Sequence, residues 1–573
     1  MVNMMDTDKR FCSILFDVME GKGVKDVVCS PGSRNAPLLI AAASRENIRK
    51  HVVIDERSAA FMALGMALVG RNPVALVCTS GTALLNYGPA IAEAFYQSVP
   101  LIVISADRPE QWIDQDDSQT LRQFEAFSNY VKRSYQLPAL GNDDAEMQWY
   151  ANRIVNDAMI EATSRRRGPV HINVQLGDPL SGKVSRAKEP PRLIDFIGGD
   201  AIGNKEIVRE LAMKMAASKV LLVAGFLPPD ARLHRSVGEI CNLPNVVAMT
   251  ETLSNLHLRD DATSIDSVLT AYSEDVLDSE APDLVISLGG SLVSRKLKEY
   301  LRRNSKYCEH WALGWNHTTS DCFMSLTKRI EVDPGRLLHQ LATVLRRTPI
   351  LTTVCDYAAV WQKLRGRALL AKSVYVSAAG WCDLKALDLL LKRLPQDVNL
   401  FLSNGTAVRY AQLLGSSMPH ANYCNRGVSG IDGSVSTAVG GAKMYKGRTV
   451  IVTGDMSMAY DINALALSSI PDNMVIIVLD NGGGGIFRFI HTTSGLEERE
   501  EYFCATPRLP LSALAPAYEF CYAEAADEVS LQTALDMIFG QSVAEVTKPM
   551  ILRIITDGEY SATVLKDYMR VKA

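Results

Sequence analysis

Two polar residues that suit a divalent cation follow two short apolar segments late in this 573-residue sequence. Residues 449–455 read TVIVTGD, a strand pattern that ends in Asp455, and a second strand pattern, residues 474–479, leads into Asp480 and Asn481. If both strands belong to one parallel sheet, Asp455 and Asn481 emerge at the same carboxyl-end edge, where open α/β sheets bind ligands. Mg²⁺ accepts carboxylate and amide oxygens and takes its other ligands from phosphates and water. The pair predicts a cation site, with the backbone carbonyl of Gly483 as a third protein ligand.

The glycines at 482–485 indicate what accompanies the cation, because glycine lets the main chain approach a bulky diphosphate closely. The alternative is that Gly454-Asp455 is an ordinary turn and the glycine run a flexible loop. We favour the cation site, because both halves of the motif follow strands and a helix-length insert, residues 461–469, lies between them.

Short apolar strands alternate with helical patterns along the whole chain, which predicts parallel sheets built from βαβ units. Two polar stretches, residues 185–192 (SRAKEPPR) and 346–349 (RRTP), interrupt this alternation. We therefore expect three α/β domains, at residues 1–187, 188–350 and 351–573, each a parallel sheet flanked by helices. The expected strands are 27–29, 51–55, 74–79, 101–105, 170–174, 220–224, 246–249, 284–288, 400–403, 450–453, 474–479 and 551–555.

Composition excludes several classes of protein. Lys and Arg number 60 and Asp and Glu 64, for a net charge of −4, so no global field attracts nucleic acid or an anionic membrane. No apolar run approaches the ~18 residues of a membrane helix, and the N-terminus lacks the apolar core of a signal peptide. The eleven cysteines include no C-x-x-C pair, which favours reduced, buried thiols over disulfides or a zinc site. We expect a cytoplasmic enzyme that neither binds nucleic acid nor inserts into membranes.

Glu56 is a candidate functional residue of the N-terminal region. It follows the expected strand 51–55 and opens a helical pattern with Phe61 and Leu64 on its apolar face. An acid in a first helical turn also complements the helix dipole, and taken alone this is the more ordinary explanation. Combined with the pattern at Asp455 and Asn481, however, a catalytic role for Glu56 is the interpretation that we favour.

The interval from Gly-Asp to Asn resembles the motif of thiamine diphosphate (ThDP) enzymes, in which an Asn-Asn pair follows Gly-Asp. Asp480 replaces the first Asn, whereas Asn481 keeps the metal-binding position. Further segments resemble the MenD family, the 2-succinyl-5-enolpyruvyl-6-hydroxy-3-cyclohexene-1-carboxylate (SEPHCHC) synthases. These segments are CSPGSRNAPL (29–38), DERSA (55–59), TSGTA (79–83), SADRP (105–109), NRGVSGIDG (425–433) and YDINALAL (460–467). The resemblance covers both outer domains in order and is weak in the middle domain.

The resemblance implies a transferase of menaquinone biosynthesis with the three-domain ThDP-binding fold. Such an enzyme decarboxylates 2-oxoglutarate and adds the succinyl-semialdehyde carbanion to isochorismate in 1,4 fashion, with ThDP and Mg²⁺, or alternatively Mn²⁺, as cofactors. Residues 1–187 would be the pyrimidine-binding domain, 188–350 a central domain and 351–573 the diphosphate-binding domain. The cofactor would lie between the first domain of one chain and the third domain of another, which implies a homodimer at least, or a homotetramer.

The resemblance also implies a role for each of several individual residues. The catalytic residues would be Glu56, which would hydrogen-bond the aminopyrimidine, together with Gln119 and Arg34. The cofactor would contact Glu56, Ser429, Ile431, Gly454, Asp455, Met456, Ser457, Asn481, Gly483 and Ile486, with Asp455, Asn481 and Gly483 binding the metal. The substrates would contact Ser33, Arg34, Arg108, Gln119, Arg295, Lys296, Arg409, Arg426, Ile486, Phe487 and Ile490.

The arginines fit the implied substrates, because both are dianions and guanidinium groups pair with carboxylates through two hydrogen bonds. An acetolactate-synthase-like carboligase remains an alternative, although its less charged substrates do not need this arginine set. A non-catalytic ThDP-fold protein is a second alternative, and it would be expected to have lost Glu56, Asp455 or Asn481. Three departures concern substrate geometry: Gly405 replaces a serine, Arg295-Lys296 reverses the expected order, and Asp480 replaces an asparagine.

Overall fold

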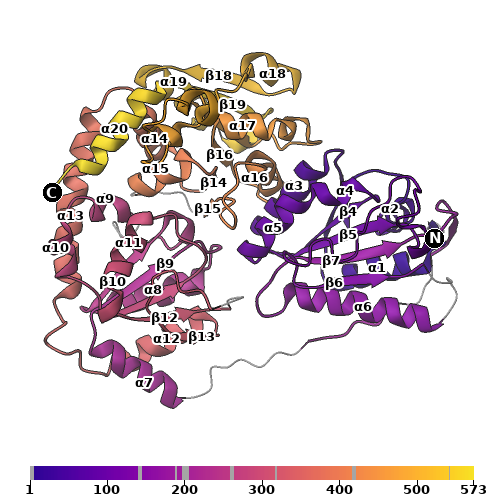
Figure 1. Cartoon of the computed structure of the whole chain (residues 1–573), viewed down its shortest axis with the longest axis horizontal. Helices are drawn as coiled ribbons and strands as arrows, with labels where there is room; N and C mark the ends of the chain where they lie inside the picture. Colours follow the sequence, from indigo (N-terminus) through magenta and orange to yellow (C-terminus); the bar gives the residue numbers. More distant parts are fainter. Residues whose placement is uncertain are drawn as a thin grey trace. The chain divides into compact units, whose positions relative to one another are not determined.

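The computed structural model describes residues 5–139, 145–186, 190–196, 205–258, 264–315, 319–415, 421–540 and 542–573 (Figure 1). The chain forms two compact units. Unit 1 contains Met1–Gly198, Asn425–Lys446 and Tyr460–Met474; unit 2 contains Gly199–Cys424, Gly447–Ala459 and Val475–Ala573. Two segments of the expected third domain, 425–446 and 460–474, therefore belong with the N-terminal residues. The expected boundary at 187/188 lies outside the described residues, and the three domain ranges stay predictions.

Unit 1 is built on a six-stranded sheet with the strand order β3-β2-β4-β5-β7-β6 and parallel pairing throughout. Helices α1, α2 and α6 pack on a core that includes Val27, Ile102 and Ile172. The strands are β2 (Asp26–Cys29), β3 (Arg49–Val52), β4 (Val74–Cys78), β5 (Leu101–Asp107), β6 (Ser134–Leu137) and β7 (Val170–Gln175), and a separate antiparallel pair joins β1 (Met5–Thr7) to β8 (Lys183–Ser185). The helices are α1 (Arg10–Gly21), α2 (Ala36–Ala43), α3 (Glu56–Gly70), α4 (Thr82–Asn86), α5 (Gly88–Gln97), α6 (Ala145–Thr163) and α16 (Ser434–Lys443).

Helices α3 and α16 pack very closely, although more than 360 residues separate them in sequence. A Cβ atom on Gly65 would lie 1.8 Å from the carbonyl oxygen of Thr437, and one on Gly440 would lie 1.9 Å from that of Met62. Only glycine fits at these two positions, because a side chain would collide with the backbone of the facing helix. The contact fixes α16, and the loop that leads into it, on the helix that begins at Glu56.

The first sheet of unit 2 has five strands in the order β10-β9-β11-β12-β13, all parallel, with a hydrophobic core on each face. Its strands are β9 (Val220–Ala224), β10 (Val246–Thr250), β11 (Leu284–Leu288), β12 (Glu309–Leu313) and β13 (Leu326–Ile330). Its helices are α7 (Lys205–Ala216), α8 (Ala231–Cys241), α9 (Ile265–Leu269), α10 (Glu274–Asp278), α11 (Arg295–Arg303) and α12 (Pro334–Leu345).

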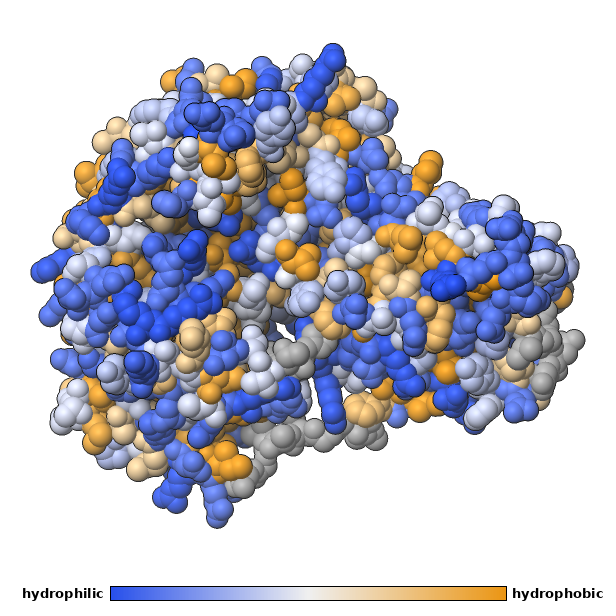
Figure 2. All heavy atoms as spheres, in the orientation of Figure 1, coloured by the Kyte–Doolittle hydropathy of each residue, from blue (hydrophilic) through white to orange (hydrophobic). Residues whose placement is uncertain are grey.

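The second sheet of unit 2 has six strands in the order β15-β14-β16-β17-β19-β18. Its strands are β14 (Asn399–Leu402), β15 (Ala421–Tyr423), β16 (Thr449–Gly454), β17 (Met474–Asp480), β18 (Cys521–Ala525) and β19 (Met550–Ile555). The helices of unit 2 that follow α12 are α13 (Tyr357–Ala378), α14 (Asp383–Arg393), α15 (Thr406–Leu414), α17 (Asp455–Tyr460), α18 (Leu511–Ala517), α19 (Glu528–Phe539) and α20 (Gly558–Arg570). Figure 2 shows polar residues over most of the face in view, so much of the hydrophobic 47% of the chain packs inside these layers.

Parallel sheets flanked by helices were expected and are observed, but two local expectations need correction. The strand expected at 51–55 is β3, which ends at Val52, because Asp55 caps α3 instead of extending the strand. The helix-length insert at 461–469 contains only a short 3-10 helix at Ile462–Ala466. The side chains of Asp461 and Asn463 bond outside that helix, to Ser436 and Asp55.

Candidate active site

The residues expected to bind a cation lie together at one edge of the second sheet of unit 2. Strand β16 ends at Gly454, directly before Asp455, and the neighbouring strand β17 ends at Asp480, directly before Asn481. The Gly483 amide donates to Asp455 Oδ2 at 2.7 Å, and the Met456 amide donates to Oδ1 at 2.7 Å. Both predicted ligands are buried, Asp455 with 2% and Asn481 with 6% of its surface exposed.

The electrostatics of this edge suit a cation. Burial raises the pKa of the Asp455 carboxyl, and the negative charge of Asp480 raises it further, while the amides of Gly483 and Met456 act in the opposite direction. Within the described part of the chain, Asn481 Oδ1 is buried and has no hydrogen-bond partner. A buried polar atom without a partner costs free energy unless a ligand satisfies it. The donor set therefore fits a hard cation such as Mg²⁺.

The glycine loop after Asn481 brings its backbone close to its neighbours. Gly483 has φ of 108°, and a Cβ atom there would lie 2.1 Å from the carbonyl oxygen of Cys504. The Gly483 carbonyl, expected as a third metal ligand, accepts a hydrogen bond from the Gly485 amide at 2.8 Å, which leaves a second lone pair. After the loop, a short 3-10 helix (Gly485–Arg488) and the turn behind it carry the predicted residues Ile486, Phe487 and Ile490, all half-buried.

The predicted basic residues of unit 2 gather around α9. Helix α9 packs against α11, which begins with Arg295 and Lys296, and against α15, which contains Arg409. Burial raises the pKa of Asp266 on α9, whereas the positive charges of Lys296 and Arg409 lower it. Arg295 and Lys296 pair with Glu299 at 2.8 and 2.9 Å, and the Arg295 side chain is 88% exposed. Lys296 and Arg409 thus act on one carboxylate, whereas Arg295 points to solvent.

In unit 1, Glu56 is the first residue of α3 and is half-buried. Asp55 caps the helix by accepting hydrogen bonds from the amides of Arg57 (3.0 Å) and Ser58 (3.4 Å), so Glu56 does not fill that role. The charge of Glu56 acts on two fully buried groups, Cys78 and Tyr87, whose pKa values burial raises and Glu56 raises further. The charge of Glu56 therefore reaches buried groups of unit 1 as well as the end of the helix.

The predicted arginines of unit 1 already have protein partners. Arg34 is buried and donates to the Leu176 carbonyl at 3.1 Å, with Asp178 at 3.6 Å. Arg108 binds the Ser118 carbonyl through Nε (3.1 Å) and Nη2 (2.9 Å) and pairs with Asp117 at 2.6 Å. A carboxylate substrate would have to share or replace these partners.

Gln119 and Ser33 lie on exposed loops of the same unit. Gln119 has φ of 60° and donates from Nε2 to the Ser80 carbonyl at 3.1 Å. A left-handed backbone is uncommon for residues other than glycine and often accompanies functional sites. Gln123, which is fully buried, accepts from the Gly81 amide at 2.8 Å and so holds the turn that Gln119 touches.

The predicted residues Arg426, Ser429 and Ile431 occupy a loop that a buried glutamate holds. Glu93, in α5, has 1% of its surface exposed and accepts hydrogen bonds from the amides of Gly427 (2.5 Å) and Val428 (2.8 Å). Ser429 follows with φ of 64°.

No sequence pattern points to Glu93 as a site residue, nor to Asp383, which contacts Asn481. The one available signal for Glu93 was a charged residue within the apolar stretch AIAEAF.

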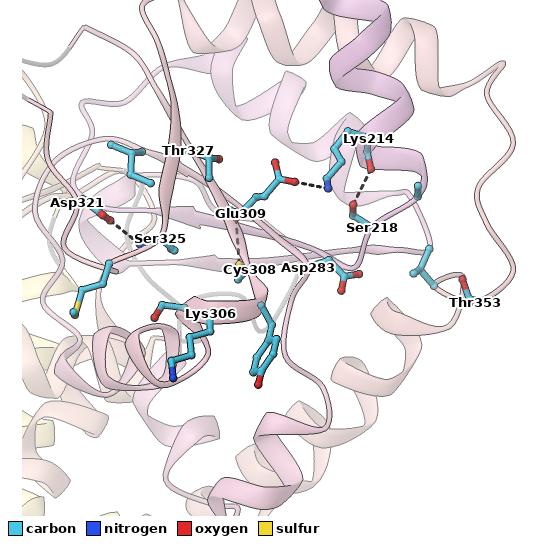
Figure 3. Close-up of a pocket in the computed structure, with 16 residues that line it drawn as sticks. Lys214, Ser218, Asp283, Lys306, Cys308, Glu309, Asp321, Ser325, Thr327 and Thr353 are labelled. Carbon is cyan, nitrogen blue, oxygen red and sulfur yellow. Dashed lines mark hydrogen bonds and ion pairs between the residues drawn. The ribbon is translucent and has the colours of Figure 1, made fainter.

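A large open pocket beside the first sheet of unit 2 contains none of the predicted site residues. It has a volume of about 780 Å³ and lies near the start of β11 and β12 (Figure 3). Three of its charged side chains have local partners: Lys214 pairs with Glu309, and the Ser325 amide donates to Asp321 at 3.0 Å.

A family model matches the N-terminal part of the chain, and known proteins match almost its whole length. Residues 9–126 match the thiamine pyrophosphate enzyme, N-terminal TPP binding domain. Proteins named SEPHCHC synthase from Porphyromonas gingivalis, Flavobacterium johnsoniae and Bacteroides fragilis are 40%, 36% and 35% identical to this chain. These alignments cover 98%, 97% and 98% of this chain and 97%, 98% and 99% of the respective relatives. None of the helices in the described ranges is long and apolar enough to cross a membrane.

Proposed function

The chain belongs to the SEPHCHC synthase family, and on that premise we propose that it is a ThDP-dependent transferase acting in menaquinone biosynthesis. It would decarboxylate 2-oxoglutarate and add the remaining succinyl-semialdehyde unit to isochorismate in 1,4 fashion. The observation that supports this most directly is the buried pair formed by Asp455 and Asn481, whose oxygens suit the metal that accompanies ThDP.

Unit 2 would hold the metal and the diphosphate. Asp455, Asn481 and the Gly483 carbonyl would bind Mg²⁺, or alternatively Mn²⁺, while Gly454, Met456 and Ser457 would line the diphosphate at the end of β16. Bound ThDP supplies a thiazolium carbon nucleophile and an electron sink for decarboxylation. Ile486 would lie against the cofactor, and Phe487 and Ile490 would line an apolar wall beside the substrate.

Unit 1 would supply the proton chemistry. Glu56 would hydrogen-bond the aminopyrimidine of the cofactor and move a proton at that carboxylate. Ser429 and Ile431 would contact the cofactor from the loop that Glu93 holds. Gln119 would act near the reacting centre.

Two dianionic substrates require several cationic partners, and the predicted arginines supply them. Arg34, with Ser33 beside it, and Arg108, Arg409 and Arg426 would bind carboxylates, with Arg295 and Lys296 at the start of α11. Since Arg108 already pairs with Asp117 at 2.6 Å, carboxylate binding there would include exchange of that partner.

The assembly proposed for the active enzyme is at least a homodimer. Each cofactor would lie between the N-terminal domain of one copy and the C-terminal domain of the other, as the resemblance implies. Light scattering after size exclusion, with and without ThDP and Mg²⁺, tests this: a monomer that turns over substrate would contradict the proposal.

One assay tests the reaction. The protein is incubated with ThDP, Mg²⁺, 2-oxoglutarate and isochorismate, and the loss of isochorismate absorbance is followed. We expect consumption that requires all four components. Turnover of pyruvate, with isochorismate untouched, would instead support an acetolactate-synthase-like enzyme.

A matched pair of variants tests the role of Glu56. Glu56→Gln should lose turnover while still binding ThDP, measured by quenching of tryptophan fluorescence. Glu146 also lies in the first turn of a helix, α6, and is exposed, so Glu146→Gln removes a helix-dipole charge at a residue outside the predicted site. Equal activity in the two variants would remove Glu56 from its assigned role.

A further inference from the structure

Asp383 is a buried carboxylate that contacts the predicted metal ligand Asn481 from a distant part of the sequence. It is the first residue of α14 and has 1% of its surface exposed. One of its oxygens accepts a hydrogen bond from Asn481 Nδ2 at 2.6 Å, across 98 residues of sequence, and the other accepts one from the Thr556 hydroxyl. Its own amide donates to Ser561 Oγ at 3.0 Å. Both the carboxylate and the backbone amide of Asp383 are therefore held by neighbouring groups.

This contact determines how the Asn481 amide is turned. A side-chain amide has an NH₂ end that donates and an oxygen end that accepts. The Asp383 carboxylate is an acceptor, so it takes the NH₂ end; the reverse rotation would place two acceptor oxygens 2.6 Å apart. The oxygen end then faces away from Asp383, and within the described residues Oδ1 is the atom left without a partner.

The backbone of the same loop is held by other groups. Arg488 Nη1 donates to the Asn481 carbonyl at 3.0 Å, and Nη2 donates to the Gly482 carbonyl at 2.8 Å. Thr506 Oγ1 also donates to the Gly482 carbonyl. Since Arg488 and Thr506 position the main chain, the rotation of the Asn481 amide depends on Asp383.

We propose that Asp383 is a positioning residue that holds the Asn481 amide with its oxygen presented to the divalent cation. This inference rests on the proposed function, in which Asp455 and Asn481 bind the metal. Groups that hydrogen-bond the ligands of a metal orient them, and removing such a group typically lowers metal affinity about 10- to 100-fold.

Exchanging the two side chains gives a direct test. The full-length protein with ThDP is titrated with Mn²⁺, and free Mn²⁺ is read from its electron paramagnetic resonance signal, which does not depend on turnover. Asp383→Asn no longer enforces one amide rotation, and Asn481→Asp places two carboxylates in contact. Each should weaken Mn²⁺ binding about tenfold or more.

The double variant Asp383→Asn, Asn481→Asp restores one donor and one acceptor with unchanged net charge. Its NH₂ group at position 383 can donate to the carboxylate at 481, whose second oxygen then faces the metal. We expect its Mn²⁺ affinity to return to within about threefold of wild type, so that the two losses do not add. Additive losses in the double variant, or wild-type affinity in both single variants, would overturn the role of Asp383.

Two further variants separate the possible failures. Asp455→Ala should abolish Mn²⁺ binding, and wild-type affinity in that variant would overturn the metal site itself rather than the role of Asp383. Thr556→Val removes the hydrogen bond to the second oxygen of Asp383 without touching Asn481, and it should weaken Mn²⁺ binding about threefold. This smaller change keeps the inference testable if the exchange variants fail to fold; unchanged affinity in Thr556→Val would then count against it.

Discussion

Two loops carry predicted cofactor-binding residues, and each is held by a buried carboxylate in a different way. In unit 1, Glu93 binds the main chain of the loop at 426–433, through the amides of Gly427 and Val428. In unit 2, Asp383 binds a side chain, that of Asn481, while Arg488 holds the carbonyls of the loop at 480–485. Glu93 thus holds its loop through the backbone, whereas Asp383 contacts its loop through the side chain that is expected to bind the metal.

This difference predicts how each loop responds to mutation. Glu93 should affect Arg426, Ser429 and Ile431 together, because it fixes the backbone that carries all three. Asp383 should affect one atom, Asn481 Oδ1, and leave the rest of its loop in place. Loss of cofactor affinity by displacement of a whole loop is thus expected in unit 1, and loss through a single contact in unit 2.

The largest effect is expected inside α16, the helix that follows the loop of unit 1. Gly440→Ala places a Cβ atom 1.9 Å from the Met62 carbonyl oxygen of α3, so the two helices must separate. We expect a loss of about 3 kcal/mol or more, measured as a drop in the calorimetric unfolding midpoint. Gly366→Ala, in α13 of unit 2, is the control, because its Cβ would meet no atom within 4 Å. That change should be neutral or stabilising by up to about 1 kcal/mol; equal midpoints for the two variants would contradict the close packing of α3 and α16.

Glu93→Gln tests the backbone-held loop directly. Glutamine offers one acceptor oxygen, so one of the two loop amides is left facing an NH₂ group, at a cost of about 1–3 kcal/mol. The half-saturating ThDP concentration, measured by fluorescence titration, should rise about tenfold, which corresponds to about 1.4 kcal/mol. Gln97 also donates to Glu93, at the same oxygen that accepts from the Gly427 amide, so Gln97→Leu removes a partner of Glu93 while Glu93 keeps both of its loop-facing oxygens. An equal rise in both variants would show that the burial of Glu93, rather than its hold on the loop, determines affinity.

Acid should act on both units through similar buried imidazoles. His171 in unit 1 contacts Ser105 at 2.8 Å and His310 in unit 2 contacts Ser287 at 2.6 Å, and burial lowers the pKa of each to about 4. The folded protein keeps both rings neutral, whereas the unfolded chain takes up protons near pH 6.5. Stability is therefore present above pH 6.5 and is lost as the pH falls toward 4, by about 1.4 kcal/mol per pH unit for each ring.

A histidine variant assigns this acid sensitivity to one unit. His171→Gln should flatten the fall of the calorimetric midpoint with pH for unit 1, because position 171 no longer carries a ring to be protonated, while His310 keeps its effect in unit 2. A slope identical to that of wild type would show that groups other than His171 determine the acid sensitivity of unit 1, and Asp107 would not be among them, because burial raises its pKa to about 6 and so favours the folded state as the pH falls.

The sequence alone was sufficient to predict that Asp455 and Asn481 lie at one edge of a sheet, because each residue directly follows a short apolar strand. The amide of Gly483 bonded to Asp455 shows that the two strand ends meet as expected. The sequence was not sufficient for Asp383 or Glu93, because an isolated acid in a helical pattern normally faces water. Their burial arises from contacts across 98 and 334 residues, which local patterns do not encode. The left-handed backbone of Gln119 and Ser429 was equally hidden, since it depends on the surrounding turns.

The smallest effect is expected from the residue that departs from the family pattern, Asp480. It pairs with Arg553 at 2.6 Å, and Arg553 also pairs with Glu524 at 3.0 Å. All three side chains are partly exposed. Asp480→Asn leaves Arg553 one carboxylate partner and should cost less than about 1 kcal/mol, with at most a threefold change in Mn²⁺ affinity. Asp383→Asn is the same chemical change at a buried carboxylate of α14, which contacts Asn481 in this loop. It should weaken Mn²⁺ binding about tenfold or more. Equal losses in the two variants would mean that the cation responds to nearby negative charge alone, whereas a large loss only at Asp383 would mean that the rotation of the Asn481 amide determines affinity.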